Sequence, residues 1–360
     1  MTNFLVSSYS MLSSPRSAVS SIQRELQIIQ KEATTGRLAD VGLSLGLRTN
    51  QAISLRSERE TIDRQLDTNA IIALRFASMQ TAMDSIAATG DEFLSSLVAN
   101  GTGDPGTLAN IQQAEASLQG LAGSLNTSAG ARFLFSGAAT DKASISFTST
   151  GGGAAAHYVD GSTAQAATAA AFSANFGFAQ NDASVGSITA SDLEAFLDGD
   201  FEDLFTTGVG GGWTDNWSNA DDGVIENRIS QSETLKVSYS ANDDAFRNIA
   251  KAYVMIADLG AAEMNEEARQ LLTSRAIETL SLGLSQLTRL QAEIGGSQAR
   301  LDLANETLDA RSDVLTASIS DLEEVDQYEA ATRVTNLTTL LETSYALTSR
   351  ISRLSLLNFI

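Results

Sequence analysis

The 360-residue sequence predicts a mainly α fold with a β-rich insertion. Both chain ends would form a long antiparallel helical bundle or coiled-coil rod, and the insertion would form an outer, solvent-facing domain. Apolar residues in both terminal thirds recur at alternating intervals of three and four residues, as in a coiled-coil seam. Only two prolines, Pro15 and Pro105, interrupt the chain. The middle lacks this spacing and is rich in glycine, alanine, threonine and serine.

These patterns divide the chain into five predicted segments. Residues 1–48 and 325–360 would be the terminal helices of an inner assembly domain. Residues 49–136 and 241–324 would be the two arms of the helical rod. Residues 137–240 would be the outer, β-rich variable domain.

The N-terminal third predicts three helices. The seam of the first consists of Leu12, Val19, Ile22, Leu26, Ile29 and Ala33. Gly36, Gly42 and Gly46 then end the pattern in a loop. Further apolar stripes predict a second helix over about residues 50–88 and a third over about residues 107–128.

The C-terminal third carries the most regular pattern of the chain. Six apolar residues stand seven apart: Leu287, Ile294, Leu301, Leu308, Leu315 and Leu322. An ideal helix drifts by about 20° per heptad, so a sustained seven-residue repeat indicates a supercoiled partner. The pattern predicts one helix over about residues 263–324, and polar residues facing the seam would fix its register. The polar stretch "EEVDQ" then marks a boundary, and a last helix would run from Tyr328 to the end.

The middle of the chain contains short alternating stretches. "ISFTST", "HYVDGST" and "LKVSYS" alternate in the manner of strands. "DLEAFLDGDFEDLF", residues 192–205, predicts a short acidic helix. It lacks the spacing of a calcium-binding loop.

Composition argues against several functions. The formal net charge of −21 argues against nucleic-acid binding and against anionic membrane surfaces. The chain has no cysteine and one histidine, His157, so we expect no enzyme activity and no catalytic, cofactor or metal site. No signal-peptide pattern and no apolar run of membrane-spanning length is visible. We therefore expect a cytosolic protein or one exported by a route that needs no Sec signal.

The two termini are unusually apolar. The chain ends on "SRISRLSLLNFI", and a helix with apolar residues on every side is normally enclosed all round. The N-terminal helix can cover only part of it, so other molecules must cover the rest. The predicted assembly interface comprises Leu12, Val19, Ile22, Leu26, Ile29, Leu337, Leu341, Ile351, Leu354, Leu356, Leu357, Phe359 and Ile360.

Three stretches resemble the bacterial flagellin superfamily, and they are most similar to its hook–filament junction proteins. "GARFLFSGAATDK" (130–142) is similar to the stretch where the family's helical rod gives way to its outer domain. The resemblance assigns that junction to Arg132, Phe133, Leu134, Phe135, Ser136 and Gly137. Residues 319–360 are similar to the family's C-terminal region. Residues 34–58 are similar to its N-terminal loop, although the Asp-Asp-Pro of many members is missing and Asp40 is the only acid between Glu32 and Glu58.

This resemblance implies a structural role in the bacterial flagellum. The chain would leave the cell by flagellar type III export, without a cleaved signal peptide. It would assemble with copies of itself as a ring between hook-associated protein 1 and flagellin, outside the cell. An export chaperone would hold the C-terminal helix beforehand. Two alternatives are a flagellin subunit of the filament itself and a coiled-coil scaffold or adhesin unrelated to flagella.

Overall fold

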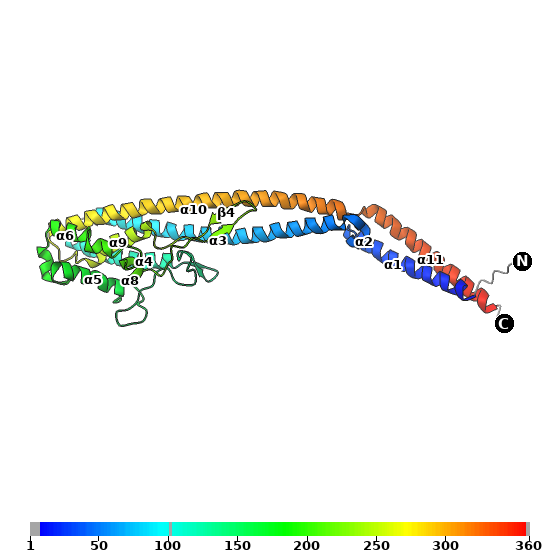
Figure 1. Ribbon diagram of the computed structural model, residues 1–360, viewed down its shortest axis with the longest axis horizontal. Helices are drawn as coiled ribbons and strands as arrows, with labels where there is room; N and C mark the ends of the chain where they lie inside the picture. The colour runs from blue at the N-terminus through cyan, green and yellow to red at the C-terminus, as the bar shows by residue number, and fades with distance from the viewer. Residues whose placement is uncertain (1–7, 101–102, 358–360) are drawn as a thin grey trace. The chain divides into compact units, whose positions relative to one another are not determined.

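The computed structural model describes residues 8–100 and 103–357, and the side chains of residues 16–100, 103 and 105–350. The chain divides into two compact units (Figure 1). Residues 1–64 and 308–360 form the terminal unit, and residues 65–307 form the central unit. Helices dominate both units, which confirms the predicted mainly α fold.

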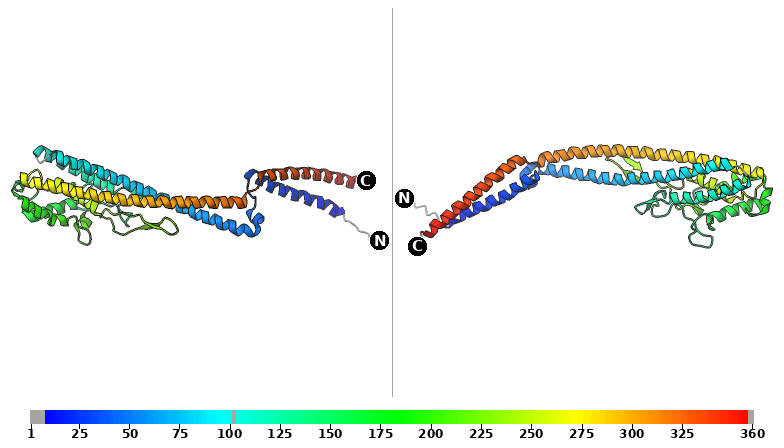
Figure 2. Two further views of the ribbon diagram at one scale, coloured as in Figure 1. Left: turned by 90° about the horizontal axis from the view of Figure 1, so that it is seen from above. Right: turned by 180° about the vertical axis from the view of Figure 1, so that it is seen from behind.

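The terminal unit is built on two long helices, α1 (Ser8–Thr35) and α11 (Gln327–Leu357). They lie side by side in every view (Figures 1 and 2). A short helix α2 (Val41–Leu45) and a 3-10 turn η1 (Gly46–Arg48) follow α1. The first helix and the last helix were both predicted, and the structure confirms them.

Two helices, α3 (Thr49–Asn100) and α10 (Glu266–Glu323), have residues in both units. Within the terminal unit they are joined by an ion pair between Arg311 and Glu58. A second pair joins Nη2 of Arg56 to Oε2 of Glu323 at 2.6 Å, where the Glu323 side chain is only 1% exposed.

Within the central unit α3 and α10 pack antiparallel. Leu287, Ile294 and Leu301 of the predicted heptad seam are completely buried there. Polar contacts fix the register: Nδ2 of Asn69 donates to Oδ1 of Asn305 at 2.7 Å, and Nε2 of Gln80 donates to the Gln291 carbonyl at 2.9 Å. The heptad repeat therefore finds its partner inside the same chain.

Two further helices complete the core of the central unit: α4 (Asp104–Leu125) and α9 (Asp244–Asp258). They pack against each other, and the ring of Phe93 on α3 meets Tyr253 on α9 edge-on at 5.3 Å. The sequence patterns did not predict α9 as a separate helix. Its polar residues Asp244, Arg247 and Lys251 do recur at helical spacing, so the signal for this helix was present in the sequence.

The middle region corrects the prediction of a β-rich insertion. It contains the helices α5 (Thr163–Phe176), α6 (Ala190–Leu197), α7 (Asp200–Asp203) and α8 (Gly212–Asn216), with a 3-10 turn η2 (Ala183–Ser187). In the described part of this region the named strands are β3 (Glu226–Arg228) and β4 (Thr234–Lys236), which pair antiparallel. The predicted acidic helix is confirmed as α6 and α7, with a break at residues 198–199.

The sequence of α5 explains why a helix follows directly on "HYVDGST", which was expected to form a strand. Its sequence is rich in alanine, the strongest helix former. The Ser162 side chain caps its first turn, and Gly177, with φ of 82°, ends it in the left-handed conformation. The stretch "HYVDGST" therefore forms the turn leading into α5.

A chain of aromatic rings forms the core of the middle region. Trp217 stacks on Trp213 at 5.0 Å and on Tyr158 at 5.1 Å, measured between ring centroids. Phe172 and Phe196 meet edge-on at 5.8 Å and extend the cluster into α5 and α6. This small region thus buries its own aromatic core.

Candidate assembly site

The terminal unit presents a two-helix seam. On α1 the side chains of Val19, Ile22 and Leu26 are half-buried, and Ile29 is 4% exposed. They face α11, whose inward positions are spaced alternately by four and three residues. These positions are Ala330, Val334, Leu337, Leu341, Ser344 and Thr348. Two helices cover only one face of each other, so most of these side chains keep part of their surface exposed.

Other apolar side chains of the same helices keep about half of their surface exposed, although the Tyr345 hydroxyl accepts a hydrogen bond from Nε2 of Gln23 on α1 at 2.7 Å. Ile28 is 45% exposed, Leu340 51%, Tyr345 49% and Leu347 56%. Leu340 and Leu347 stand seven residues apart and so share one face of α11. An exposed apolar face of this kind is typical of a surface that binds another protein.

The structure places the predicted interface residues in three groups. Val19, Ile22, Leu26, Ile29, Leu337 and Leu341 lie in the seam within one chain. Leu12, Ile351, Leu354, Leu356 and Leu357 lie in helices, with side chains outside the described residues. Phe359 and Ile360 lie outside the described residues altogether. The predicted list missed Ile28, Leu340, Tyr345 and Leu347, which fall between seam positions. Their large apolar side chains on an otherwise polar face were the available signal.

The α1–α2 loop is tied to the α10–α11 turn by backbone hydrogen bonds. The Gly36 carbonyl accepts from the Val325 amide at 3.0 Å, and the Leu38 amide donates to the Glu323 carbonyl at 2.9 Å. Gly36 has φ of 67°, a backbone conformation that favours glycine, and a Cβ there would meet the flexible end of the Gln327 side chain at 2.8 Å. Asp40 caps α2 by accepting from the Leu43 amide at 2.9 Å. The lone acid of this loop therefore acts as a helix cap.

Charge is divided unevenly between the two units. The central unit carries 30 acidic and 11 basic side chains, whereas the terminal unit carries 14 acidic and 12 basic ones. Helices α1 and α11 together hold six basic and four acidic residues. Copies of the terminal helices can therefore approach one another without the repulsion that the central unit would produce.

The predicted junction residues lie at a tight hairpin and the buried segment after it. Strands β1 (Ser128–Ala129) and β2 (Arg132–Phe133) pair around Gly130 and Ala131, whose φ angles of 60° and 62° suit a two-residue hairpin turn. Arg132 is exposed and Phe133 half-buried, whereas Leu134, Phe135, Ser136 and Gly137 are buried.

The middle region leaves and re-enters the helical core at this same point. The Ala241 amide donates to the Phe135 carbonyl at 2.7 Å, and the Gly137 amide donates to the Tyr239 carbonyl at 3.0 Å. Gly137 has φ of 60°, and a Cβ there would lie 1.6 Å from the Asp221 carbonyl oxygen. No other residue fits at this crossing.

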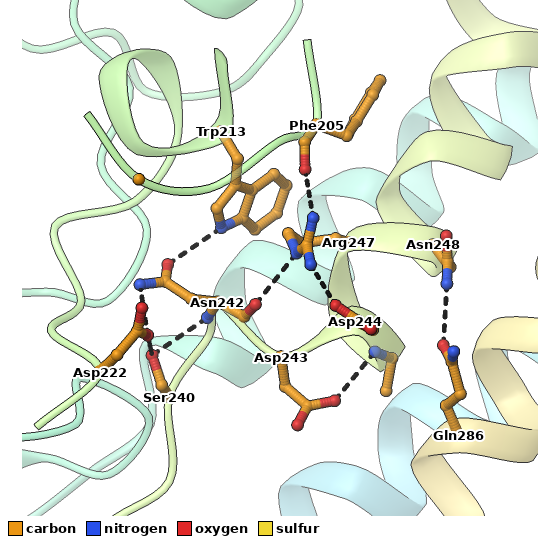
Figure 3. A network of polar contacts seen from close by, with 12 residues as sticks. Phe205, Trp213, Asp222, Ser240, Asn242, Asp243, Asp244, Arg247, Asn248 and Gln286 are labelled. Atoms are coloured by element: carbon orange, nitrogen blue, oxygen red, sulfur yellow. Dashed lines mark hydrogen bonds and ion pairs between the residues drawn. The ribbon is translucent and has the colours of Figure 1, made fainter. Parts of the chain in front are cut away.

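A network of polar contacts holds the returning chain (Figure 3). Oδ1 of Asn242 accepts from the Trp213 indole at 3.2 Å, and its Nδ2 donates to Asp222 at 2.9 Å. Arg247 donates to the carbonyls of Asn242 and Phe205 at 3.0 and 2.6 Å, and its guanidinium also pairs with Asp244. These bonds join α9 to the middle region.

The described side chains contain no group of three or more residues placed to hold a metal ion. His157, the single histidine of the sequence, is exposed. None of the helices in the described ranges is long and apolar enough to cross a membrane.

Comparisons with known proteins agree with this architecture. Residues 6–140 match the bacterial flagellin N-terminal helical region, and residues 276–360 match the bacterial flagellin C-terminal helical region. A comparison with curated proteins found no significant match. The fold is similar to a solved structure assigned as a flagellar hook-associated protein from Vibrio parahaemolyticus. The two chains are 12% identical with a TM-score of 0.51, and the similarity covers 77% of this chain and 97% of the other.

The two family matches cover both helical ends, and these are the parts that build the seam, the α3–α10 pair and the junction. The chain therefore belongs to the bacterial flagellin superfamily, whose members are structural proteins of the flagellum.

Proposed function

We propose that this protein is the junction subunit between the flagellar hook and the filament. The observation that carries the proposal is the α1–α11 pair, which leaves Ile28, Leu340, Tyr345 and Leu347 exposed on helices of little net charge. Such a surface needs neighbours, and side-by-side copies of the same helices would cover it. Two further points support a junction role: the motifs at residues 130–142 and 319–360, and the fold shared with an assigned hook-associated protein.

In this role the terminal helices form the inner layer of a ring, and the acidic middle region faces solvent. Hook-associated protein 1 lies on one side of the ring and flagellin on the other. The chain reaches this position by flagellar type III export, which leaves no cleaved signal peptide. An export chaperone covers α11 in the cytosol, because its exposed leucines would otherwise promote aggregation.

Immunogold labelling of isolated flagella tests the location. The proposal predicts a single band of label at the boundary between hook and filament. Deleting the gene should leave intact hooks and release flagellin into the medium. Label confined to any other structure, or deletion cells that have hooks but release no flagellin, would contradict the proposal.

The second candidate is a flagellin subunit of the filament. The matches at both chain ends favour it equally, because they describe flagellins in general. The N-terminal loop lacks the Asp-Asp-Pro of many family members, and this difference is compatible with a flagellin subunit. Label along the whole filament, with loss of the filament on deletion, would establish this candidate in place of the first.

A further inference from the structure

Two arginine side chains of the central unit lie near each other and have no acidic partner in the described chain. Arg75 is half-buried on α3, and Arg132 is exposed at the first position of β2. Among the described side chains, neither guanidinium takes part in an ion pair or a hydrogen bond. Such a pair is unexpected in a unit that carries 30 acidic side chains and 11 basic ones.

Other basic side chains of this unit do have acidic partners. Lys236, Lys251 and Arg300 each pair with a glutamate, at N–O distances of 3.4, 2.7 and 2.7 Å. Arg247 and Arg275 each pair with an aspartate. The two arginines on α3 and β2 therefore stand out as cations that the chain itself does not neutralise.

The fold fixes these two arginines close together. Thr127, two residues beyond the end of α4, lines the same surface cleft as Ser78 of α3. Arg75 precedes Ser78 by three residues and so lies about one helical turn away on the same face. The β1–β2 hairpin begins directly after Thr127. The Leu134 amide donates back to the Thr127 carbonyl at 3.0 Å, which returns the strand that carries Arg132 to this end of α4.

Burial and charge both act on the Arg75 guanidinium. Its Nε is buried and has no hydrogen-bond partner in the described structure. Burial lowers the pKa of Arg75, and the nearby Arg132 cation lowers it further. Arginine nevertheless keeps its proton in proteins, so two like charges face each other and one of them is partly desolvated. A bound anion would offset both the repulsion and the lost hydration.

The two guanidiniums define the chemistry of a suitable ligand. Each presents N–H donors in a planar fork that matches the oxygens of a phosphate, a sulfate or a carboxylate. Together they carry two positive charges. A doubly charged tetrahedral oxyanion neutralises both charges, whereas a single carboxylate neutralises only one.

We propose that Arg75 and Arg132 form a binding site for a small divalent oxyanion, sulfate or phosphate. The bound ion fastens the β1–β2 hairpin to α3, directly before the buried junction residues 134–137. This inference goes beyond the proposed function, and it does not depend on how copies of the chain assemble.

A sulfate titration of the full-length protein tests the site, because sulfate keeps both charges at neutral pH. The protein is labelled with nitrogen-15 arginine, and the side-chain Nε–Hε signals are followed by NMR at constant ionic strength. The Arg75 and Arg132 signals are identified by their loss in Arg75→Lys and Arg132→Lys. They should shift together along one saturating curve, whereas the signal of Arg289, exposed on α10, should not move with them. Shifts that never saturate, or an equal shift of Arg289, would overturn the proposal.

Glutamine variants provide a second readout. Arg132→Gln changes an exposed side chain, so the fold should be retained, and it should weaken sulfate binding at the Arg75 signal by about tenfold or more. Arg289→Gln removes the same charge elsewhere and should leave the dissociation constant unchanged. Equal sulfate affinities in these two variants would contradict the assignment.

A comparison of anions tests the class of ligand. Acetate, titrated in place of sulfate at the same ionic strength, should bind about tenfold more weakly, because it neutralises only one of the two cations. Tighter binding of acetate than of sulfate would show that the site is built for a carboxylate, and the oxyanion assignment would then be wrong.

Discussion

The hydroxyl of Tyr158 donates a hydrogen bond to Oδ2 of Asp258 at 2.8 Å, at the last residue of α9. The pKa of Asp258 is raised to about 6, chiefly by burial; hydrogen bonds from Tyr158 and Gln165 oppose the rise, and the nearby Glu115 carboxylate adds to it. Burial also raises the pKa of Tyr158 well above its usual value, so the phenol stays a donor. A carboxylate is thus held inside the central unit by hydrogen bonds.

This arrangement predicts that the central unit is more stable in mild acid. Above pH 6 the folded state holds an unfavourable buried charge, and the unfolded state does not. Lowering the pH from 8 to 5 protonates Asp258 in the folded state first. The free energy of unfolding should therefore rise by about 1–3 kcal/mol. Denaturant unfolding followed by tryptophan fluorescence measures it, since Trp217 stacks on Tyr158.

Asp258→Asn should remove most of this pH dependence and still accept the bond from Tyr158. Asp160→Asn, which changes an exposed acid in the same region, should retain it. An unchanged pH slope in Asp258→Asn would show that another group is responsible.

The two glycines with φ of 60° near the junction should differ sharply in their tolerance of alanine. Gly137→Ala should lower the free energy of unfolding by more than about 3 kcal/mol, because its Cβ would collide with the Asp221 carbonyl. Gly130→Ala should cost only about 1–2 kcal/mol, the strain of the backbone conformation alone, since nothing lies near its Cβ. Urea unfolding of both variants checks this, and equal losses would mean that the crossing relaxes around the added carbon.

Removing Arg56 should loosen the end of α10. Arg56→Ala leaves the Glu323 carboxylate buried without its cation, and Oε1 of Glu323 has no hydrogen-bond partner in the described structure. Because Arg56 is itself half exposed, we expect the free energy of local unfolding at this end of α10 to fall by about 1–3 kcal/mol. Amide hydrogen exchange in residues 317–325 should accelerate accordingly. Arg59→Ala breaks an exposed ion pair with Asp63. It should change the free energy of local opening of residues 317–325, measured by the same exchange, by no more than about 0.5 kcal/mol.

Charging the exposed face of α11 should prevent assembly without unfolding the chain. Leu340→Asp with Leu347→Asp changes side chains that are 51% and 56% exposed, so helix content should be preserved. The variant should be exported yet missing from isolated flagella, as checked by immunoblotting and motility. Thr332→Asp with Thr339→Asp adds the same charge at exposed polar positions and should assemble. Normal motility of the leucine variant would exclude this face from the interface.

The long helices could be predicted from sequence because their cores are periodic. The heptads from Leu287 to Leu301 have one partner helix, so their spacing alone determines which side is buried. The middle region could not be predicted in the same way. Its core depends on contacts between aromatic rings distant in sequence, such as Tyr158 with Trp217, and on alanines whose helix propensity outweighs short alternating stretches.

The candidate site was predictable in part for a related reason. The seam residues follow the coiled-coil spacing, so the sequence identifies Val19, Ile22 and Leu337. Spacing alone does not separate a seam within one chain from a surface between chains. The exposure of Leu340 and Tyr345 required the packing of α1 against α11 to be known.

The paired exit and return of the chain at Phe135 and Ala241 has a consequence for how this protein can change. Because both ends of the middle region meet at one hydrogen-bonded crossing, its length does not alter the register of α3 against α10. Changes of length in exposed loops of the middle region, such as residues 150–154, therefore leave this crossing in place, whereas replacement of the whole region would also remove the bonds from Asn69 and Arg300 to Ile229 and Glu233.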